Sequence, residues 1–147
     1  MSATLFLRIA AVIALLNGAG HTAGAPWIPA TDTAQLATIE AMKGQTFEIE
    51  GVHRTYWSFY FGFGVIISVF LFLQAIVLWQ LGALAKTAAA PLRGVIAAFL
   101  AASLANAYLG WKYFFAIPTA MSVAIAVCLV IALQLAGKAP QLRVPDR

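Results

Sequence analysis

Four long stretches of the chain are almost entirely apolar, and the longest of them, residues 57–82, contains no charged side chain. As a helix, a stretch of that length rises about 1.5 Å per residue and exceeds the roughly 30 Å apolar core of a bilayer. The other three stretches cover residues 3–22, 92–111 and 113–136. Because backbone polar groups in lipid must bond within their own segment, each stretch is predicted to be a transmembrane helix. The expected fold is all-α: a four-helix transmembrane bundle that forms one integral membrane domain over residues 1–147.

Aromatic residues and composition support this class. The longest stretch is entered through Tyr56, Trp57, Phe59, Tyr60, Phe61 and Phe63, and Trp79 lies near its other end. Aromatic rings with polar tips are typical of the two membrane–water boundaries. Hydrophobic residues make up 63% of the chain and charged residues only 10%, against about 25% charged residues in soluble domains.

Residues 23–55 form the only sizeable connection, and a short amphipathic helix is predicted within it. Asp32 resembles an N-terminal cap and Gly44 a C-terminal stop. Leu36, Ile39 and Met42 fall at helical spacing between them, which favours a helix lying on the outer headgroups.

An extended stretch is expected after that helix. Phe47 and Ile49 alternate with Glu48 and Glu50, which predicts one apolar and one acidic face.

The first apolar stretch also has features of a signal peptide. Ala23 and Ala25 resemble a cleavage site, but Pro26 would follow it, and Arg8 comes after apolar residues instead of in a basic leading region. A retained helix is the favoured interpretation, with the Arg8 stem buried and its guanidinium reaching the headgroups.

The charge distribution predicts the orientation. An even number of spans puts both termini on one side, together with the basic residues Lys86, Arg93, Lys138, Arg143 and Arg147. The opposite side holds Lys43, Arg54 and Lys112 and the acidic residues Asp32, Glu40, Glu48 and Glu50. The positive-inside rule then makes both termini cytoplasmic. The net charge of +4 is therefore interpreted as a topological signal, and no nucleic-acid site is expected.

Small residues recur every four positions on the predicted helices, which lets helices approach closely in lipid. The positions are Ala10, Ala14 and Gly18; Gly64 and Ser68; Gly94, Ala98, Ala102, Asn106 and Gly110; and Ala116, Ala120, Ala124, Cys128, Ala132 and Ala136. Packing within the bundle is the first interpretation. A homo-oligomer or docking onto a larger membrane complex is the alternative.

Polar residues near the outer leaflet form the candidate ligand-binding set. Its members are Asn17, His21, His53, Arg54, Tyr60 and Asn106. Intramembrane polar groups are expensive, so they are functional candidates by default. They could converge on one outward-facing pocket for a lipid-like or quinone-like ligand, or bond between helices as structural contacts.

Catalytic chemistry is the alternative reading. His21 or His53 with Glu48 or Glu50 would supply acid–base groups for a small membrane enzyme acting on a lipophilic substrate. No nucleophile motif, metal-binding motif or glycine-rich phosphate loop accompanies them, so no metal and no cofactor are expected. Cys128 is the only cysteine, which excludes an intrachain disulfide.

Two local sequences carry a resemblance. One is Asn17-Gly18-Ala19-Gly20-His21-Thr22-Ala23-Gly24, and the other is His53-Arg54-Thr55-Tyr56-Trp57-Ser58-Phe59-Tyr60-Phe61-Gly62-Phe63-Gly64. Together they resemble a family of small bacterial four-helix membrane proteins without an assigned reaction, more distantly similar to the DoxX-like proteins. The resemblance implies a bacterial inner-membrane location and singles out His21, His53, Arg54, Tyr60 and Gly62. The DoxX-like relationship suggests partnership with redox or quinone-linked enzymes by analogy of fold alone.

The function expected from these patterns is that of a small accessory or binding protein. It would pack into a membrane complex, hold a lipid-like or quinone-like ligand at its outer mouth, or do both.

Overall fold

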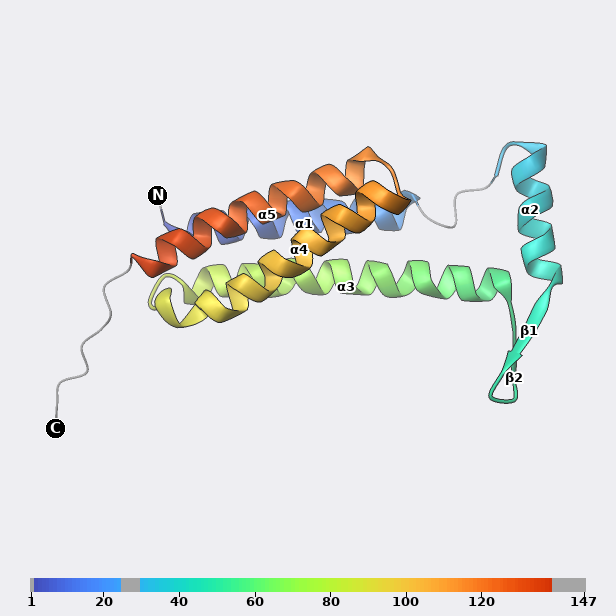
Figure 1. Ribbon diagram of the computed structural model, residues 1–147, viewed down its shortest axis with the longest axis horizontal. Helices are drawn as coiled ribbons and strands as arrows, with labels where there is room; N and C mark the ends of the chain where they lie inside the picture. The colour runs from blue at the N-terminus through green and yellow to red at the C-terminus, as the bar shows by residue number, and fades with distance from the viewer. Residues whose placement is uncertain (1, 25–29, 139–147) are drawn as a thin grey trace. The chain divides into compact units, whose positions relative to one another are not determined.

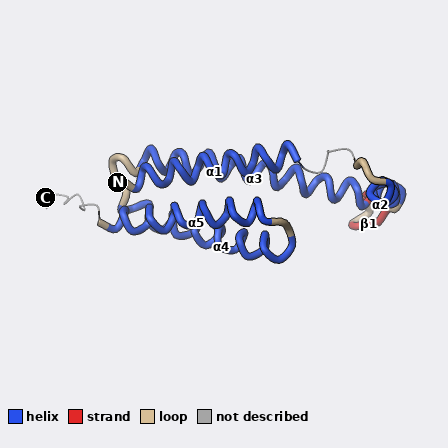
Figure 2. Tube along the Cα trace, turned by 90° about the horizontal axis from the view of Figure 1, so that it is seen from above, coloured by secondary structure: helices blue, strands red, loops and turns tan. Residues whose placement is uncertain are grey.

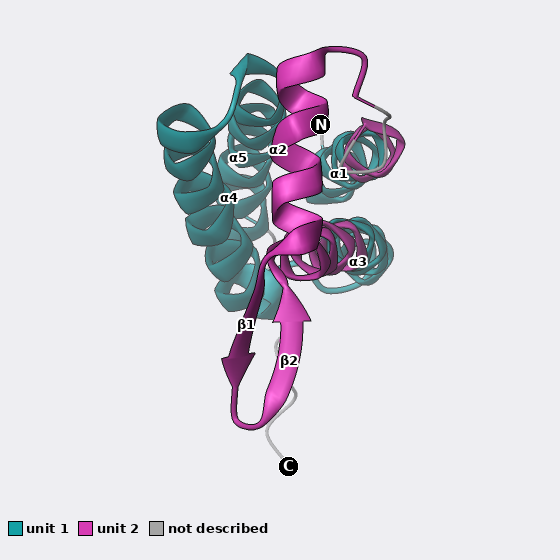
Figure 3. Ribbon diagram, turned by 90° about the vertical axis from the view of Figure 1, so that its right-hand side faces the viewer, with its two compact units in different colours: residues 1–17, 71–147 teal, residues 18–70 magenta. Residues whose placement is uncertain are grey.

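The computed structural model describes residues 2–24 and 30–138. Its helices are α1 (Ala3–Gly24), α2 (Thr33–Gly44), α3 (Tyr56–Leu84), α4 (Arg93–Tyr113) and α5 (Ala116–Gly137), with a short 3-10 turn, η1 (Ala90–Leu92), before α4. Two strands, β1 (Thr46–Ile49) and β2 (Val52–Thr55), complete the described elements. The chain divides into two compact units, coloured separately in Figure 3: unit 1 is residues 1–17 and 71–147, and unit 2 is residues 18–70.

The four predicted membrane spans are confirmed as helices. α1, α3, α5 and η1 with α4 are each long and apolar enough to cross a bilayer. The chain is therefore a small integral membrane protein with an all-α transmembrane architecture. The 29 residues of α3 reach about 44 Å, so this helix extends about 14 Å beyond a 30 Å apolar core.

The turn between the last two spans lies later than predicted. The expected spans ended at residue 111 and resumed at residue 113, but α4 continues to Tyr113 and α5 begins only at Ala116. The backbone N–H of Phe114 still bonds Gly110 O at 3.0 Å, and the chain leaves the helix only at Phe114. Aromatic residues and lysine are compatible with the last turn of a helix, so composition alone placed the helix end too early.

Unit 1 is a bundle in which consecutive helical segments run in opposite directions (Figure 1). Figure 2 shows its part of α1 alongside its part of α3, and α4 alongside α5. The start of α1, the end of α3, the start of α4 and the end of α5 consequently lie at one end of the bundle, called here the basic end (Arg8, Lys86, Arg93 and Lys138).

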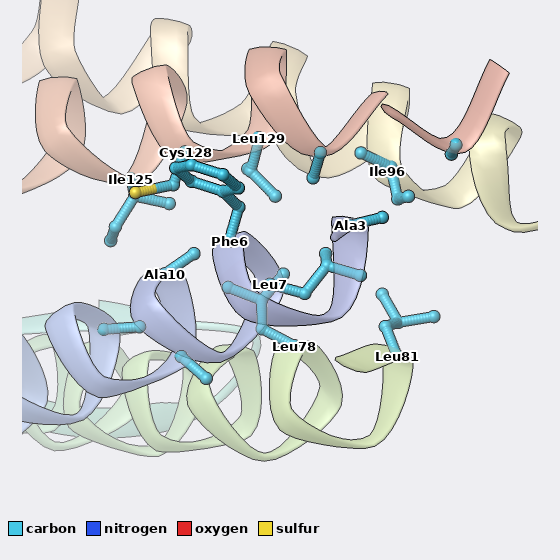
Figure 4. Packing of buried hydrophobic residues seen from close by; sticks show 14 of the residues in the cluster. Ala3, Phe6, Leu7, Ala10, Leu78, Leu81, Ile96, Ile125, Cys128 and Leu129 are labelled. Atoms are coloured by element: carbon cyan, nitrogen blue, oxygen red, sulfur yellow. The ribbon is translucent and has the colours of Figure 1, made fainter. Parts of the chain in front are cut away.

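The core of unit 1 forms where α1 meets the other helices (Figure 4). Phe6 points from α1 towards Ile125 and Cys128 of α5, and Leu7 lies beside Leu78 of α3. Leu7 and Leu78 are completely buried. In a membrane such contacts stabilise through close packing and dispersion, because lipid is as apolar as the core itself.

The small-residue prediction is confirmed on α1 and on the second half of α5. Ala10 and Ala14 of α1 are fully buried. On α5, the buried positions include Cys128, Ala132 and Ala136. These positions let α1 and α5 contribute to one close-packed cluster.

On α4, packing within the bundle, the first interpretation of the stripe, is wrong for four of its five positions. Gly94, Ala98, Ala102 and Asn106 are exposed, whereas the buried residues of α4 are Ile96, Ser103 and Gly110. Those three recur every seven residues, the period of a helix seam packed against a neighbour. Half-buried Phe99 and Leu100 join the core from the same side. On α4, therefore, Ile96 and its neighbours Phe99 and Leu100 face the core, whereas the small-residue stripe faces outward until its last member, Gly110, which is buried.

In unit 2, the predicted short helix is confirmed as α2. Asp32 is its N-terminal cap, since the carboxylate accepts a 2.8 Å hydrogen bond from Ala34 N, and the helix ends at Gly44. No residue of α2 is buried.

The predicted extended stretch is half of a hairpin. β1 and β2 pair antiparallel, with Ile49 opposite Val52 as the last pair before the turn. The two turn residues, Glu50 and Gly51, have φ of 53° and 76°. Two positive φ values are the pattern of a type I′ turn, whose twist matches paired strands. Glu50 therefore belongs to the turn, and the expected acidic face is limited to Glu48.

Candidate functional site

A polar cluster joins the end of α1 to α3 within unit 2. His21 Nδ1 lies 3.1 Å from Ser68 Oγ, and Thr22 Oγ1 lies 3.0 Å from the same Ser68 Oγ. Ser68 is buried, while His21 and Thr22 are half-buried. Three polar side chains thus meet inside segments that are otherwise apolar enough to span a membrane.

The two hydroxyl groups in this cluster also bond to their own helices. Thr22 Oγ1 lies 2.7 Å from Gly18 O, and Ser68 Oγ lies 3.3 Å from Gly64 O. Such bonds to the carbonyl four residues earlier satisfy Ser and Thr within a helix. The imidazole has no equivalent local partner among the described residues, so Ser68 fixes the orientation of His21.

Sequence reasoning identified His21 but missed Ser68, its partner, and Thr22, which bonds the same hydroxyl. Ser68 was interpreted as a small packing residue four positions after Gly64. The signal in the sequence was the Ser68 hydroxyl, one turn after Gly64 in an apolar span. A glycine one turn away leaves room for a serine to reach a facing helix.

A second pair lies on the hairpin of unit 2. Glu48 and His53 are directly opposite in the strand register, and His53 Nε2 lies 3.5 Å from Glu48 Oε2. Both side chains are more than half exposed, at 56% and 70% respectively. An exposed ion pair of this kind contributes little to stability because water screens it.

The opposite face of the hairpin anchors it to α3. The Phe47 ring lies 5.1 Å from the Tyr56 ring and 5.4 Å from the Phe59 ring. Arg54 projects from the same face as Phe47 and donates from Nη1 to the backbone oxygen of His53 at 2.9 Å. The aromatic contacts therefore hold the Glu48–His53 pair at the first turn of α3.

His21 and the hairpin carboxylates meet α3 at different levels. β2 ends at Thr55, next to Tyr56, whereas Ser68 lies about 18 Å further along the helix at 1.5 Å per residue. The structure pairs Glu48 with His53, and it pairs His21 with the hydroxyl of Ser68.

The hydrogen bonds and the ion pair that define these two clusters do not include the remaining predicted residues. Tyr60 is exposed, with its ring 5.8 Å from the Trp57 ring. Asn17 is half-buried and Asn106 exposed, and both belong to unit 1. The six candidate ligand-binding residues are therefore divided between two compact units.

Metal-ligating side chains do not gather in the described residues: no three His, Cys, Asp or Glu side chains lie close enough to hold an ion there. Cys128 is a buried free thiol in the core of unit 1. What the His21 cluster can do chemically is accept or donate hydrogen bonds at an imidazole positioned by the Ser68 hydroxyl.

Comparison of the chain with protein-family models, curated proteins and solved structures gives no match.

Proposed function

We propose that this protein is an accessory subunit of a larger membrane complex and docks onto a partner helix through the outward face of α4. The exposed residues near the middle of that face are Leu104 and five alanines, Ala97, Ala98, Ala101, Ala102 and Ala105. The outward face of α3 carries large side chains instead, among them Phe59, Phe63, Ile66, Phe70 and Ile76. Large apolar side chains suit lipid tails, whereas an alanine surface suits the close approach of another helix backbone.

Asn106 is the observation that carries the proposal. Its amide is exposed on the same face as Ala98 and Ala102, about one turn after Ala102 and two turns after Ala98. It has no hydrogen-bond partner among the described residues. A polar side chain facing lipid without a partner is unfavourable. A facing helix would supply that hydrogen bond, so the amide and the alanine surface support the same kind of neighbour.

The experiment is extraction of the full chain from its native membrane in mild detergent, followed by native mass spectrometry. The expected result is a stoichiometric complex with a larger membrane protein. Ala98→Leu and Ala102→Leu should reduce the complex at least about ten-fold, because a leucine separates the two backbones. Ala120→Leu, the same substitution at an exposed position of α5, is the matched control and should leave the complex intact.

A partner-free monomer, or a homo-oligomer alone, overturns the accessory role. Equal loss of the complex in Ala120→Leu would show that α4 is not the docking face.

A ligand-binding role is the second candidate, and the His21 cluster favours it. Nδ1 of His21 is held by Ser68, and no bond from Nε2 to another described residue accompanies it. An imidazole nitrogen in an apolar surrounding suits the carbonyl or headgroup of a lipid-like or quinone-like molecule. Co-extracted small molecules should then be lost in His21→Ala and retained in His53→Ala; equal amounts in wild type and His21→Ala would exclude this role.

The enzymatic alternative depends on a histidine beside a carboxylate. The His53–Glu48 pair is the arrangement that supports it, although the pair is exposed. If it carries acid–base chemistry, Glu48→Gln and His53→Gln should each abolish turnover of a lipophilic substrate without changing stability. Undiminished turnover in both variants rejects the hypothesis.

We also propose that the protein resides in a bacterial inner membrane with both termini in the cytoplasm. The positive charge at the basic end of unit 1 supports this orientation. In a Cys128→Ser background, an impermeant maleimide added to intact cells should label Thr33→Cys in α2 but not Ser2→Cys. Labelling of Ser2→Cys before permeabilisation would show that the N-terminus lies outside the cytoplasm and would contradict this orientation.

A further inference from the structure

Arg8 is the one charged residue placed well inside α1, and its guanidinium lies on an aromatic ring. Arg8 Cζ is 4.7 Å from the centre of the Trp79 ring of α3. Arg8 is about 7.5 Å along the helix from Ala3, and Trp79 is about 7.5 Å from Leu84 at 1.5 Å per residue. Since α3 exceeds the apolar core by about 7 Å at each end if centred in it, both side chains lie close to the boundary between lipid tails and headgroups.

Gly82 makes room for this arrangement. A Cβ atom there would lie 3.0 Å from Arg8 Cγ and 3.4 Å from Thr4 O. The absence of a side chain lets the Arg8 stem pass between α1 and α3 towards Trp79.

The guanidinium has no anionic partner in the described part of unit 1. Arg8 Nε is enclosed by protein without a hydrogen bond. All described acidic residues of the chain, Asp32, Glu40, Glu48 and Glu50, belong to unit 2. Unit 1 contributes Lys86, Arg93 and Lys138 to the same basic end, and no carboxylate accompanies them among the residues of unit 1 that the structure describes.

Arg93 is a second guanidinium at the basic end, and it packs against the end of α5. A Cβ on Gly137 would be 3.3 Å from Arg93 Cζ and 3.4 Å from its Nη1. A planar guanidinium held by packing presents its remaining donors in a fixed fork, which matches two phosphate oxygens.

We infer that the basic end of unit 1 binds the phosphodiester of an anionic phospholipid, with the Arg8 guanidinium, stacked on Trp79, as the principal contact. The depth of Arg8 at the headgroup level selects a lipid phosphate over a dissolved anion. Neighbouring lysines and Arg93 add long-range attraction to an anionic leaflet. The inference is independent of docking through α4.

The test uses the full chain in a neutral detergent, titrated with dioleoyl phosphatidylglycerol and read by native mass spectrometry. Dioleoyl phosphatidylcholine is the zwitterionic arm, and inorganic phosphate is the competing free anion. Phosphatidylglycerol adducts should exceed phosphatidylcholine adducts at equal concentration, and millimolar phosphate should not displace them. Equal occupancy by the two lipids, or complete displacement by inorganic phosphate, overturns the inference.

Arg8→Gln should lower phosphatidylglycerol occupancy about five-fold, the loss expected for one cation at an anionic surface. The matched control is Lys112→Gln. It removes one cation from the last turn of α4, at the end of that helix away from the basic end. Arg8→Lys keeps the charge but loses the planar guanidinium that stacks on Trp79, so its phosphatidylglycerol occupancy should fall between those of wild type and Arg8→Gln. Equal losses in Arg8→Gln and Lys112→Gln contradict a specific site.

A measurement on the unaltered chain covers the case in which Arg8→Gln does not fold. Raising sodium chloride from 50 to 500 mM should reduce phosphatidylglycerol occupancy several-fold, because salt screens partly exposed charges. Occupancy that is independent of salt overturns the inference without any variant.

Discussion

A Cβ atom on Gly110 would lie 2.7 Å from Thr119 Oγ1 and 3.4 Å from Thr119 Cα. Gly110 is the last buried position of α4, and Thr119 lies in the first turns of α5. Thr119 Oγ1 is also held by Phe115 O at 3.2 Å, so it is not a freely moving end. The absence of a side chain at residue 110 therefore sets how closely α4 and α5 approach beside their connecting turn.

Gly110→Ala is expected to destabilise the protein by about 1–3 kcal/mol, the usual cost of forcing extra atoms into a packed contact. Thermal unfolding in detergent measures the change. Gly94→Ala is the control on the same helix, since nothing lies within 4 Å of its added Cβ. Alanine is the better helix former, so this control should be neutral or slightly stabilising.

Thr119→Ala combined with Gly110→Ala tests the stated cause. Removing the hydroxyl and the methyl should restore most of the lost stability. A double variant as unstable as Gly110→Ala alone would mean that another contact limits the approach.

Ser68→Ala removes the hydroxyl shared by His21 and Thr22. The expected loss is about 0.6–1.7 kcal/mol, the range of interhelical hydrogen bonds in membrane proteins. A double-mutant cycle with His21→Ala isolates the pair. Additive losses would show that the 3.1 Å contact contributes no coupling energy.

Gly51→Ala is expected to weaken the hairpin, because φ at this residue is 76° and a left-handed conformation costs a residue with a Cβ about 1–2 kcal/mol. Glu50→Asn should strengthen it, since Asn-Gly is the preferred type I′ pair. Amide exchange in β1 and β2 reports both effects. Unchanged exchange in Gly51→Ala would indicate that the hairpin does not persist in solution.

Ala132→Leu is expected to disrupt the core of unit 1. Ala132 is fully buried on α5, and the extra side-chain volume has no space to occupy. The unfolding temperature should fall by several degrees, whereas Val127→Leu, at an exposed position of the same helix, should leave it unchanged. Similar temperatures for the two variants would contradict the assigned inward face of α5.

Hydropathy along the chain was sufficient to predict the four spanning helices, and capping chemistry at Asp32 and Gly44 was sufficient to place α2. Both signals are local. A run of apolar residues must form a helix in lipid whatever surrounds it, and an N-terminal cap depends only on residues within one helical turn. The resemblance to small bacterial and DoxX-like four-helix proteins stays a prediction.

Which face of a helix is buried was decided only by tertiary packing. Gly94, Ala98 and Ala102 form as regular a stripe as Ala10 and Ala14, yet α4 turns Ile96 inward and α1 turns its alanines inward. In lipid every face is apolar, so the sequence lacks the polar–apolar contrast that marks the inward side of a helix in water. Tertiary structure also decided the partners of His21 and Glu48. His21 meets Ser68 through a contact between two helices that are distant in sequence, and Glu48 meets His53 because a two-residue turn sets the strand register.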